Sequence, residues 1–316
     1  MILSVSRRTD IPAFYSEWFF KRLEKGFLYV KNPMNRKQIS EISLDQEVID
    51  CIVFWTKNPG PMISQLHKIK DYNFYFQYTI TPYDLSIEKM VPTVDHSIST
   101  FKSLSDRIGS KNIIWRYDPI FLTDKYNFDR HVEEFSKLAK SLSGYTKKCV
   151  ISFLDVYKKC ERNMRHIRFE TMTNTQTNLL AKKMSEICSI YGIEIETCAE
   201  DIDLLDFGIK KGKCIDDDLI AEICKKNIKV KKDKNQREVC GCVSSIDIGD
   251  YNSCPHSCLY CYANFDSLRV EENLKQHDSN CELLYGRLIG DEKITLRKMT
   301  SLFEKAPPES SQGSLF

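Results

Sequence analysis

The chain has 316 residues, with 46 Lys and Arg against 44 Asp and Glu, and 42% of its residues are hydrophobic. This composition is typical of a globular protein and excludes a disordered, collagen-like or low-complexity chain. No run of about 18 consecutive apolar residues is present, so we expect no membrane span. The first ten residues, MILSVSRRTD, contain no basic-then-apolar signal region, and we therefore expect a cytoplasmic protein.

Short β-branched and aromatic runs alternate with segments of helical periodicity, which is the pattern of repeated βα units. Strands are expected at Ile2–Ser6, Ile49–Trp55, Asn73–Ile80, Asn112–Tyr117, Cys149–Leu154, Ile193–Cys198 and Ser244–Ile248. Helices are expected from Ser16, as the N-cap, to Gly26, from Val132 to Leu142, and from Thr175 to Tyr191. Parallel strands with helical crossovers predict an α/β fold that closes as a (β/α) barrel.

Polar residues follow six of these strands. The sequences are SRRTDIP, WTKNP, TITPYD, WRYDP, LDVYKK and ETCAED, in chain order. The loops after the strand C-termini build the site in parallel barrels, so we expect these ends to share one pocket. The alternative is that they are polar turns without a common site.

The chain divides into five segments by composition. Residues 1–224 carry the barrel strands and helices, 225–239 form a basic connection, and 240–264 form a cysteine-rich segment that completes the barrel. Residues 265–305 are expected to be a helical extension and 306–316 a disordered tail.

Thirteen cysteines are many for a protein of a reducing compartment, where a surplus of thiols indicates metal binding. Cys254, Cys258 and Cys261, here called the cysteine triplet, form a CxxxCxxC motif. Three thiolates at this spacing suit a four-iron four-sulfur (4Fe–4S) cluster and leave one iron open to an outside molecule. Zinc is the competing interpretation, with His256 as a further ligand.

The residues CPHSCLYCYAN resemble the signature of radical S-adenosylmethionine (SAM) enzymes, in particular the spore photoproduct lyase type. SVSRRTDIPAFY, FWTKNPGPM and WRYDPIF resemble later strand motifs of those enzymes. The order agrees once the first strand is moved to the end, so the barrel is expected to be circularly permuted, with its cluster-binding strand near the C-terminus. The chain resembles a bacterial family of unknown function with this rearranged pattern.

The resemblance implies a radical SAM enzyme of lyase or transferase type. It implies a 4Fe–4S cluster on the cysteine triplet, whose open iron is chelated by SAM, and reductive cleavage to a 5'-deoxyadenosyl radical that abstracts hydrogen from an unknown substrate. It also implies an electron donor such as flavodoxin or ferredoxin. Tyr260 is expected beside the adenine.

Thr9, Asp10 and Lys57 are placed by the same resemblance around the methionine end of SAM. The alternative for Lys57 is a solvated loop lysine. Arg116 and Asp118 are expected to contact ribose, the SAM carboxylate or substrate, and an internal Arg–Asp ion pair is their alternative.

Cys198, Cys214, Cys240 and Cys242, here called the cysteine quartet, are candidates for a second iron–sulfur cluster or a zinc site. Cys51, Cys149, Cys188 and Cys224 lie in apolar segments and are expected to be core residues.

The last five residues, QGSLF, resemble the peptide with which bacterial repair proteins bind the DNA sliding clamp, through Gln312, Leu315 and Phe316. Together with the lyase resemblance, this favours damaged or modified DNA as the substrate. The rival hypothesis is a non-catalytic iron–sulfur or zinc adaptor recruited to the clamp.

Overall fold

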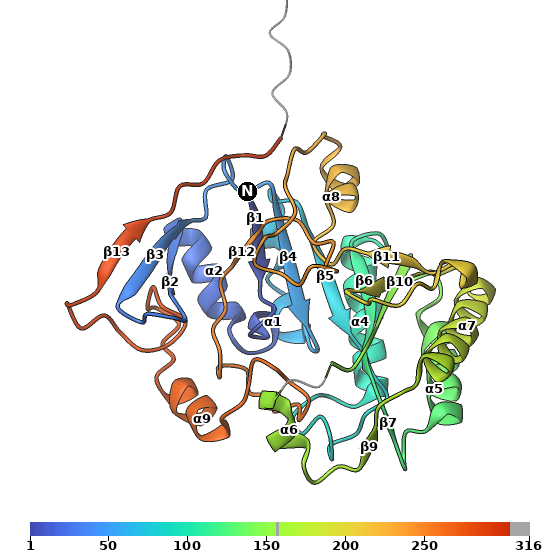
Figure 1. Cartoon of the computed structure of the whole chain (residues 1–316). Coiled ribbons are helices and arrows are strands. Elements are labelled where there is room, and N and C mark those ends of the chain that lie inside the picture. Colours follow the sequence, from blue (N-terminus) through green and yellow to red (C-terminus); the bar gives the residue numbers. More distant parts are fainter. Residues whose placement is uncertain (156–157, 304–316) are drawn as a thin grey trace, which may run out of the picture.

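The core of the protein is an eight-stranded parallel sheet (Figure 1). The structure is a computed structural model and describes residues 1–155 and 158–303. The strand order is β11-β10-β8-β6-β5-β4-β1-β12. In chain order the strands are β1 (Ile2–Val5), β4 (Cys51–Thr56), β5 (Phe74–Thr79), β6 (Ile113–Ile120), β8 (Lys148–Phe153), β10 (Glu194–Cys198), β11 (Lys210–Gly212) and β12 (Ile246–Asp247).

All seven predicted strands are present with ends within three residues of those expected, and the α/β class is confirmed. β11 was not predicted, because three residues give too short a pattern to detect. β12, formed near the end of the chain, pairs in parallel with β1 through Leu3 and Ile246. Within the described residues, β11 and β12 lie at opposite edges and do not pair, so the sheet is open and no closed barrel is observed.

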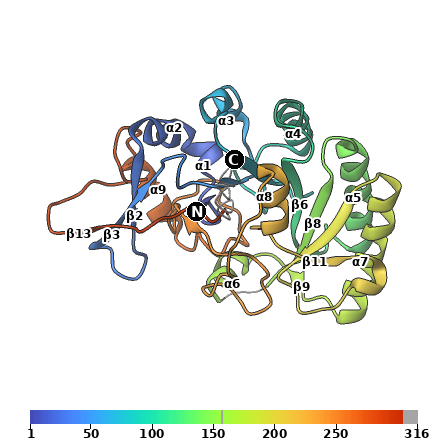
Figure 2. The same ribbon diagram turned by 90° about the horizontal axis from the view of Figure 1, so that it is seen from above.

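Helices cover one side of the sheet in an arc (Figure 2). They are α2 (Ser16–Lys25), α3 (Gly60–Ile63), α4 (Val94–Ile108), α5 (Phe128–Leu142) and α7 (Asn174–Ile190). The other helical elements are α1 (Ile11–Phe14), α6 (Lys158–Met164), α8 (Asp217–Cys224), α9 (Ser267–Lys275), η1 (Leu66–Ile69) and η2 (Leu205–Phe207). None of the helices in the described ranges has both the length and the apolar character needed to cross a membrane.

The three predicted helices are confirmed as α2, α5 and α7. Gly26 ends α2 with φ of 80°, a conformation that glycine adopts without steric cost. The prediction that Ser16 is an N-cap is wrong: Tyr15 is the N-cap and Ser16 is the first helical residue. The reason is that α1 ends immediately before, so the side-chain cap is supplied one helix earlier, by Asp10.

The two faces of the sheet pack against different partners because side chains alternate along a strand. Leu3, Phe54 and Trp115 are fully buried on the face that contacts the helices. Val53 and Ile114, on the opposite face, belong to a second apolar cluster with Ile215, Cys240 and Val243 of the chain after β11. The chain after β11, which carries Cys214, Cys240 and Cys242, therefore covers the face of the sheet that lacks the helical arc.

Two small sheets complete the structure. β2 (Phe27–Lys31), β3 (Gln38–Ser43) and β13 (Lys293–Leu296) form one, and β7 (Leu122–Thr123) with β9 (Phe169–Glu170) forms the other. The segment 265–303 contains one helix, α9, and one strand, β13, which pairs with β3. Residues 312–316, the predicted clamp peptide, lie outside the described residues.

Candidate functional site

A cavity of about 850 Å³ opens at the C-terminal ends of the parallel strands. Each of the six predicted polar strand ends contributes at least one residue to its lining, so the shared pocket is confirmed. Its volume lies in the range of small-molecule and cofactor sites, about 300–1,000 Å³. Every proposed ligand or contact lines it: Thr9, Asp10, Lys57, Arg116, Asp118, Tyr260, the cysteine triplet and the cysteine quartet.

The polarity of the cavity wall follows a gradient along β6. On β6, Ile114 lies near the start, Arg116 follows two residues later, and Asp118 follows after another two. Residues two apart share a face, so this one face changes from apolar at its base to charged at the C-terminal end. Ile114 packs in the second apolar cluster, whereas Arg116 and Asp118 line the cavity.

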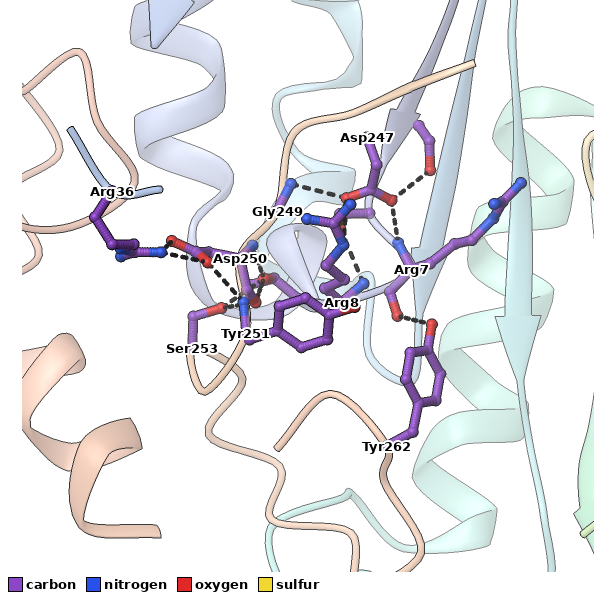
Figure 3. A network of polar contacts seen from close by, with 12 residues as sticks. Arg7, Arg8, Arg36, Asp247, Gly249, Asp250, Tyr251, Ser253 and Tyr262 are labelled. Carbon is purple, nitrogen blue, oxygen red and sulfur yellow. Dashed lines mark hydrogen bonds and ion pairs between the residues drawn. The ribbon is translucent and has the colours of Figure 1, made fainter. Parts of the chain in front are cut away.

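The loop carrying the cysteine triplet is fixed to the loop after β1 by a polar network (Figure 3). Asp247, at the end of β12, accepts hydrogen bonds from Ser4 Oγ at 2.9 Å, Ser6 Oγ at 2.5 Å and Arg7 N at 2.9 Å. Gly249 is required where these loops meet, because a Cβ there would lie 2.1 Å from Ser6 Oγ. Two segments about 240 residues apart in the chain are thus joined at the cavity wall.

Thr9 lies in this junction. It is 2% exposed, its hydroxyl accepts the backbone N–H of Asp250 at 3.0 Å, and it lies 2.6 Å from Ser253 Oγ. The Thr9 hydroxyl therefore connects the first strand to the residue that precedes Cys254.

Asp10 connects three segments. Its Oδ2 accepts the N–H of Lys57 at 2.6 Å and lies 2.8 Å from His256 Nε2, while its Oδ1 caps α1 through Ala13 N at 3.0 Å. His256 Nδ1 lies 3.1 Å from the carbonyl oxygen of Met90. Both ring nitrogens of His256 thus face oxygen acceptors, which assigns this side chain to positioning the loop of the cysteine triplet and argues against a ligand role.

The spacing of the thiols distinguishes between the two metals considered for the cysteine triplet. Within the part of the chain that the structure describes, Asp216, Asp217 and Asp218 are the only three His, Cys, Asp or Glu side chains whose ligand atoms all lie within 4.8 Å of one another. The triplet thiols are therefore spread more widely. In a tetrahedral zinc site with bonds of about 2.3 Å, sulfur atoms lie only about 3.8 Å apart. The observed donor set fits a larger, polynuclear group better than a single ion.

Lys57 is a buried ion-pair partner and not a solvated loop lysine. Its side chain is 13% exposed, and Nζ donates to Glu88 Oε1 at 2.9 Å. Burial alone would lower the pKa of Lys57, but the charges of Glu88 and Cys258 outweigh it, so the pKa is raised. Nζ also lies 5.8 Å from the centre of the Tyr260 ring. Lys57 therefore carries its charge within the wall of the cavity.

Glu88 is a site residue that the sequence analysis missed. It is 2% exposed, accepts the Thr81 hydroxyl at 2.6 Å, and also accepts the hydroxyl of Tyr260. Its backbone forms an antiparallel bridge with Cys258. The only sequence signal was its position seven residues after Thr81, in the polar loop that follows β5.

Arg116 forms the internal ion pair with Asp118 that was its alternative interpretation, and the guanidinium also contacts sulfur. Nη1 donates to Cys214 Sγ at 2.8 Å, and the guanidinium lies 5.2 Å from the centre of the Trp55 ring. Although burial opposes the charge, Cys214 and Asp118 raise the pKa of Arg116 well above its ordinary value. Arg116 thus links the cavity wall to the cysteine quartet.

Of the four cysteines that were expected in the core, three are buried. Cys51, Cys149 and Cys188 are at most 1% exposed, whereas Cys224 is half-buried at the end of α8.

Comparison with known proteins gives one match. A family model described as a domain of unknown function, DUF1848, matches residues 2–263. The matched region contains every residue that lines the cavity except Asn264 and Arg297, and it ends before the tail. No curated protein and no solved structure matches the chain. The chain therefore belongs to the DUF1848 family.

Proposed function

We propose that the protein is a radical SAM enzyme. The observation that carries the proposal is the placement of the three thiols of the cysteine triplet on one loop that lines the large cavity at the strand C-termini. Three thiolates bind three irons of a 4Fe–4S cluster and leave the fourth iron for the amino and carboxylate groups of SAM. When bound and reduced, such a cluster supplies the electron that cleaves SAM into methionine and a 5'-deoxyadenosyl radical.

The chain's own residues would bind and orient the ligands. Asp10 and His256 fix the loop of the cysteine triplet against the first two strand ends, which keeps the three thiols on one side of the cavity. The ring of Tyr260, oriented through its hydroxyl by Glu88, offers an aromatic surface for adenine. Lys57 and Arg116 are buried cations in the wall, and they favour an anionic group such as the SAM carboxylate.

A nucleic acid substrate is part of the proposal. The basic residues Arg7, Arg8, Lys31 and Arg297 line the same cavity and are suited to phosphate. Trp55 lines it as well and could stack on an extruded base. Damaged or modified DNA is therefore the first substrate class to test.

The test is anaerobic reconstitution with iron and sulfide, reduction with dithionite in the presence of SAM, and assay of 5'-deoxyadenosine. Wild type should form it, and Cys258→Ala should not. Cys224→Ala is the matched control, because this thiol does not line the cavity, and it should behave as wild type. Bound iron whose EPR spectrum does not respond to SAM, with no 5'-deoxyadenosine, would refute the proposal.

The rival function is an adaptor that binds metal without cleaving SAM. Deletion of residues 312–316 separates the two hypotheses. If the tail only recruits an enzyme, the deletion abolishes binding to the sliding clamp and leaves SAM cleavage intact. Clamp binding by a protein that holds stoichiometric zinc and never cleaves SAM would favour the adaptor.

A further inference from the structure

The cysteine quartet comes from three separate segments that meet on the face of the sheet without the helical arc. Cys198 is the last residue of β10, Cys214 follows β11 by two residues, and Cys240 and Cys242 precede β12. Cys198 Sγ lies 2.9 Å from Cys214 Sγ. The thiol of Cys242 in turn contacts those of Cys214 and Cys240. Four sulfur atoms therefore form one continuous group at the cavity wall.

The backbone around the quartet is fixed by buried polar contacts. The carbonyl oxygen of Cys214 accepts Tyr75 Oη at 2.8 Å and Gln77 Nε2 at 2.9 Å, both from β5. Ile215 N donates to Cys242 Sγ at 3.4 Å. These contacts orient the thiols before any ligand binds, and N–H donors to sulfur are a feature of thiolate-ligated metals.

The charge beside the quartet is positive. Arg116 Nη1 donates to Cys214 Sγ at 2.8 Å, and the guanidinium groups of Arg116 and Arg7 lie 5.2 and 5.5 Å from the centre of the Trp55 ring. Nη2 of Arg7 is buried and has no hydrogen-bond partner within the described residues. Burying a cation is costly unless an anion compensates it, and neutral thiols do not. Arg116 is paired with Asp118, whereas Arg7 has no ion-pair partner within 4.0 Å among the described residues. The site is thus suited to a group with net negative charge.

We propose that Cys198, Cys214, Cys240 and Cys242 bind a second metal centre through four thiolates. This centre is separate from the cysteine triplet, and the proposal goes beyond the proposed function, since it stands whether or not the protein cleaves SAM. Four thiolates outweigh the positive charge of one zinc ion or of one oxidised iron–sulfur core, so the bound centre is anionic beside Arg7 and Arg116.

Another pair of contacting thiols lies away from the cavity. Cys51 and Cys224 also contact each other, yet neither lines the cavity. This pair provides a matched control for thiol loss without loss of the site.

The experiment uses the full chain with Cys254, Cys258 and Cys261 all changed to Ala, purified without oxygen, so that metal at the quartet is measured alone. Iron, acid-labile sulfide and zinc are counted per chain. We expect iron with matching sulfide and a charge-transfer absorption, because no three of the quartet thiols lie within 4.8 Å of one another within the described residues; about one zinc per chain would also show a second metal centre. The two arms distinguish zinc from an iron–sulfur centre, and either supports the proposal. Adding Cys214→Ser should remove the metal, whereas adding Cys224→Ser should retain it.

A folded triple variant without metal, judged by circular dichroism, would overturn the proposal. So would a Cys198–Cys214 disulfide found by mass spectrometry in the anaerobic protein. If the triple variant does not fold, the wild-type stoichiometry decides the question. Iron beyond a single four-iron cluster, or zinc beside it, supports a second centre, and a single four-iron cluster without zinc refutes it.

Discussion

Removing one partner of the ion pair between Lys57 and Glu88 should strongly destabilise the cavity wall. Glu88 is 2% exposed and Lys57 13%, and their charged atoms are 2.9 Å apart. At an effective dielectric constant of about 20, the Coulomb attraction at this distance is about 6 kcal/mol. Desolvation of both groups offsets much of it, but removing one partner leaves the other charge buried. We therefore expect Glu88→Ala to reduce the free energy of unfolding by about 3–5 kcal/mol.

The assay is thermal and denaturant unfolding of the full chain at matched metal content. At about 2 °C per kcal/mol, the melting temperature should fall by roughly 6–10 °C. Glu24→Ala is the matched control, because Glu24 forms an exposed pair with Lys68 that should contribute less than about 1 kcal/mol. The double variant Lys57→Met with Glu88→Met should recover most of the loss, since no uncompensated charge remains. Equal effects of Glu88→Ala and Glu24→Ala would refute the reasoning.

Two further predictions test the junction of the strand ends and the acid stability of the fold. Gly249→Ala places a Cβ 2.1 Å from Ser6 Oγ, so we expect the free energy of unfolding to fall by about 1–3 kcal/mol. Adding Ser6→Gly should recover part of this loss. An unchanged melting temperature of Gly249→Ala would contradict the close approach. Burial lowers the pKa of His131. Below about pH 6.5 the unfolded state therefore binds a proton that the folded state does not, and the free energy of unfolding should decrease by about 1.4 kcal/mol for each pH unit as the pH falls. His131→Gln should remove this slope between pH 6.5 and the lowered pKa. His67→Gln, at an exposed histidine, should retain it. Identical slopes in the wild type and both variants would exclude His131 as the source.

The sequence by itself determined seven of the eight strands of the central sheet and the position of the cysteine triplet. Runs such as that around Val53 alternate or cluster apolar residues over five or more positions, and this local signal survives without knowledge of partners. The spacing of the triplet is also local, because its three thiols lie on one loop. The polar residues after each strand predicted a common cavity, since parallel strands place their C-termini at one edge.

Only the tertiary structure decided which of those polar residues bind one another in the cavity wall. Thr9 and Asp10 make buried hydrogen bonds to the loop of the cysteine triplet, and Glu88 joins the site through contacts with Lys57 and Tyr260 that no sequence spacing encodes. The open edges of the sheet and the convergence of the cysteine quartet likewise depend on pairings between segments far apart in the chain. Such contacts form because buried charges and polar groups need partners, and only the folded chain brings those partners within reach.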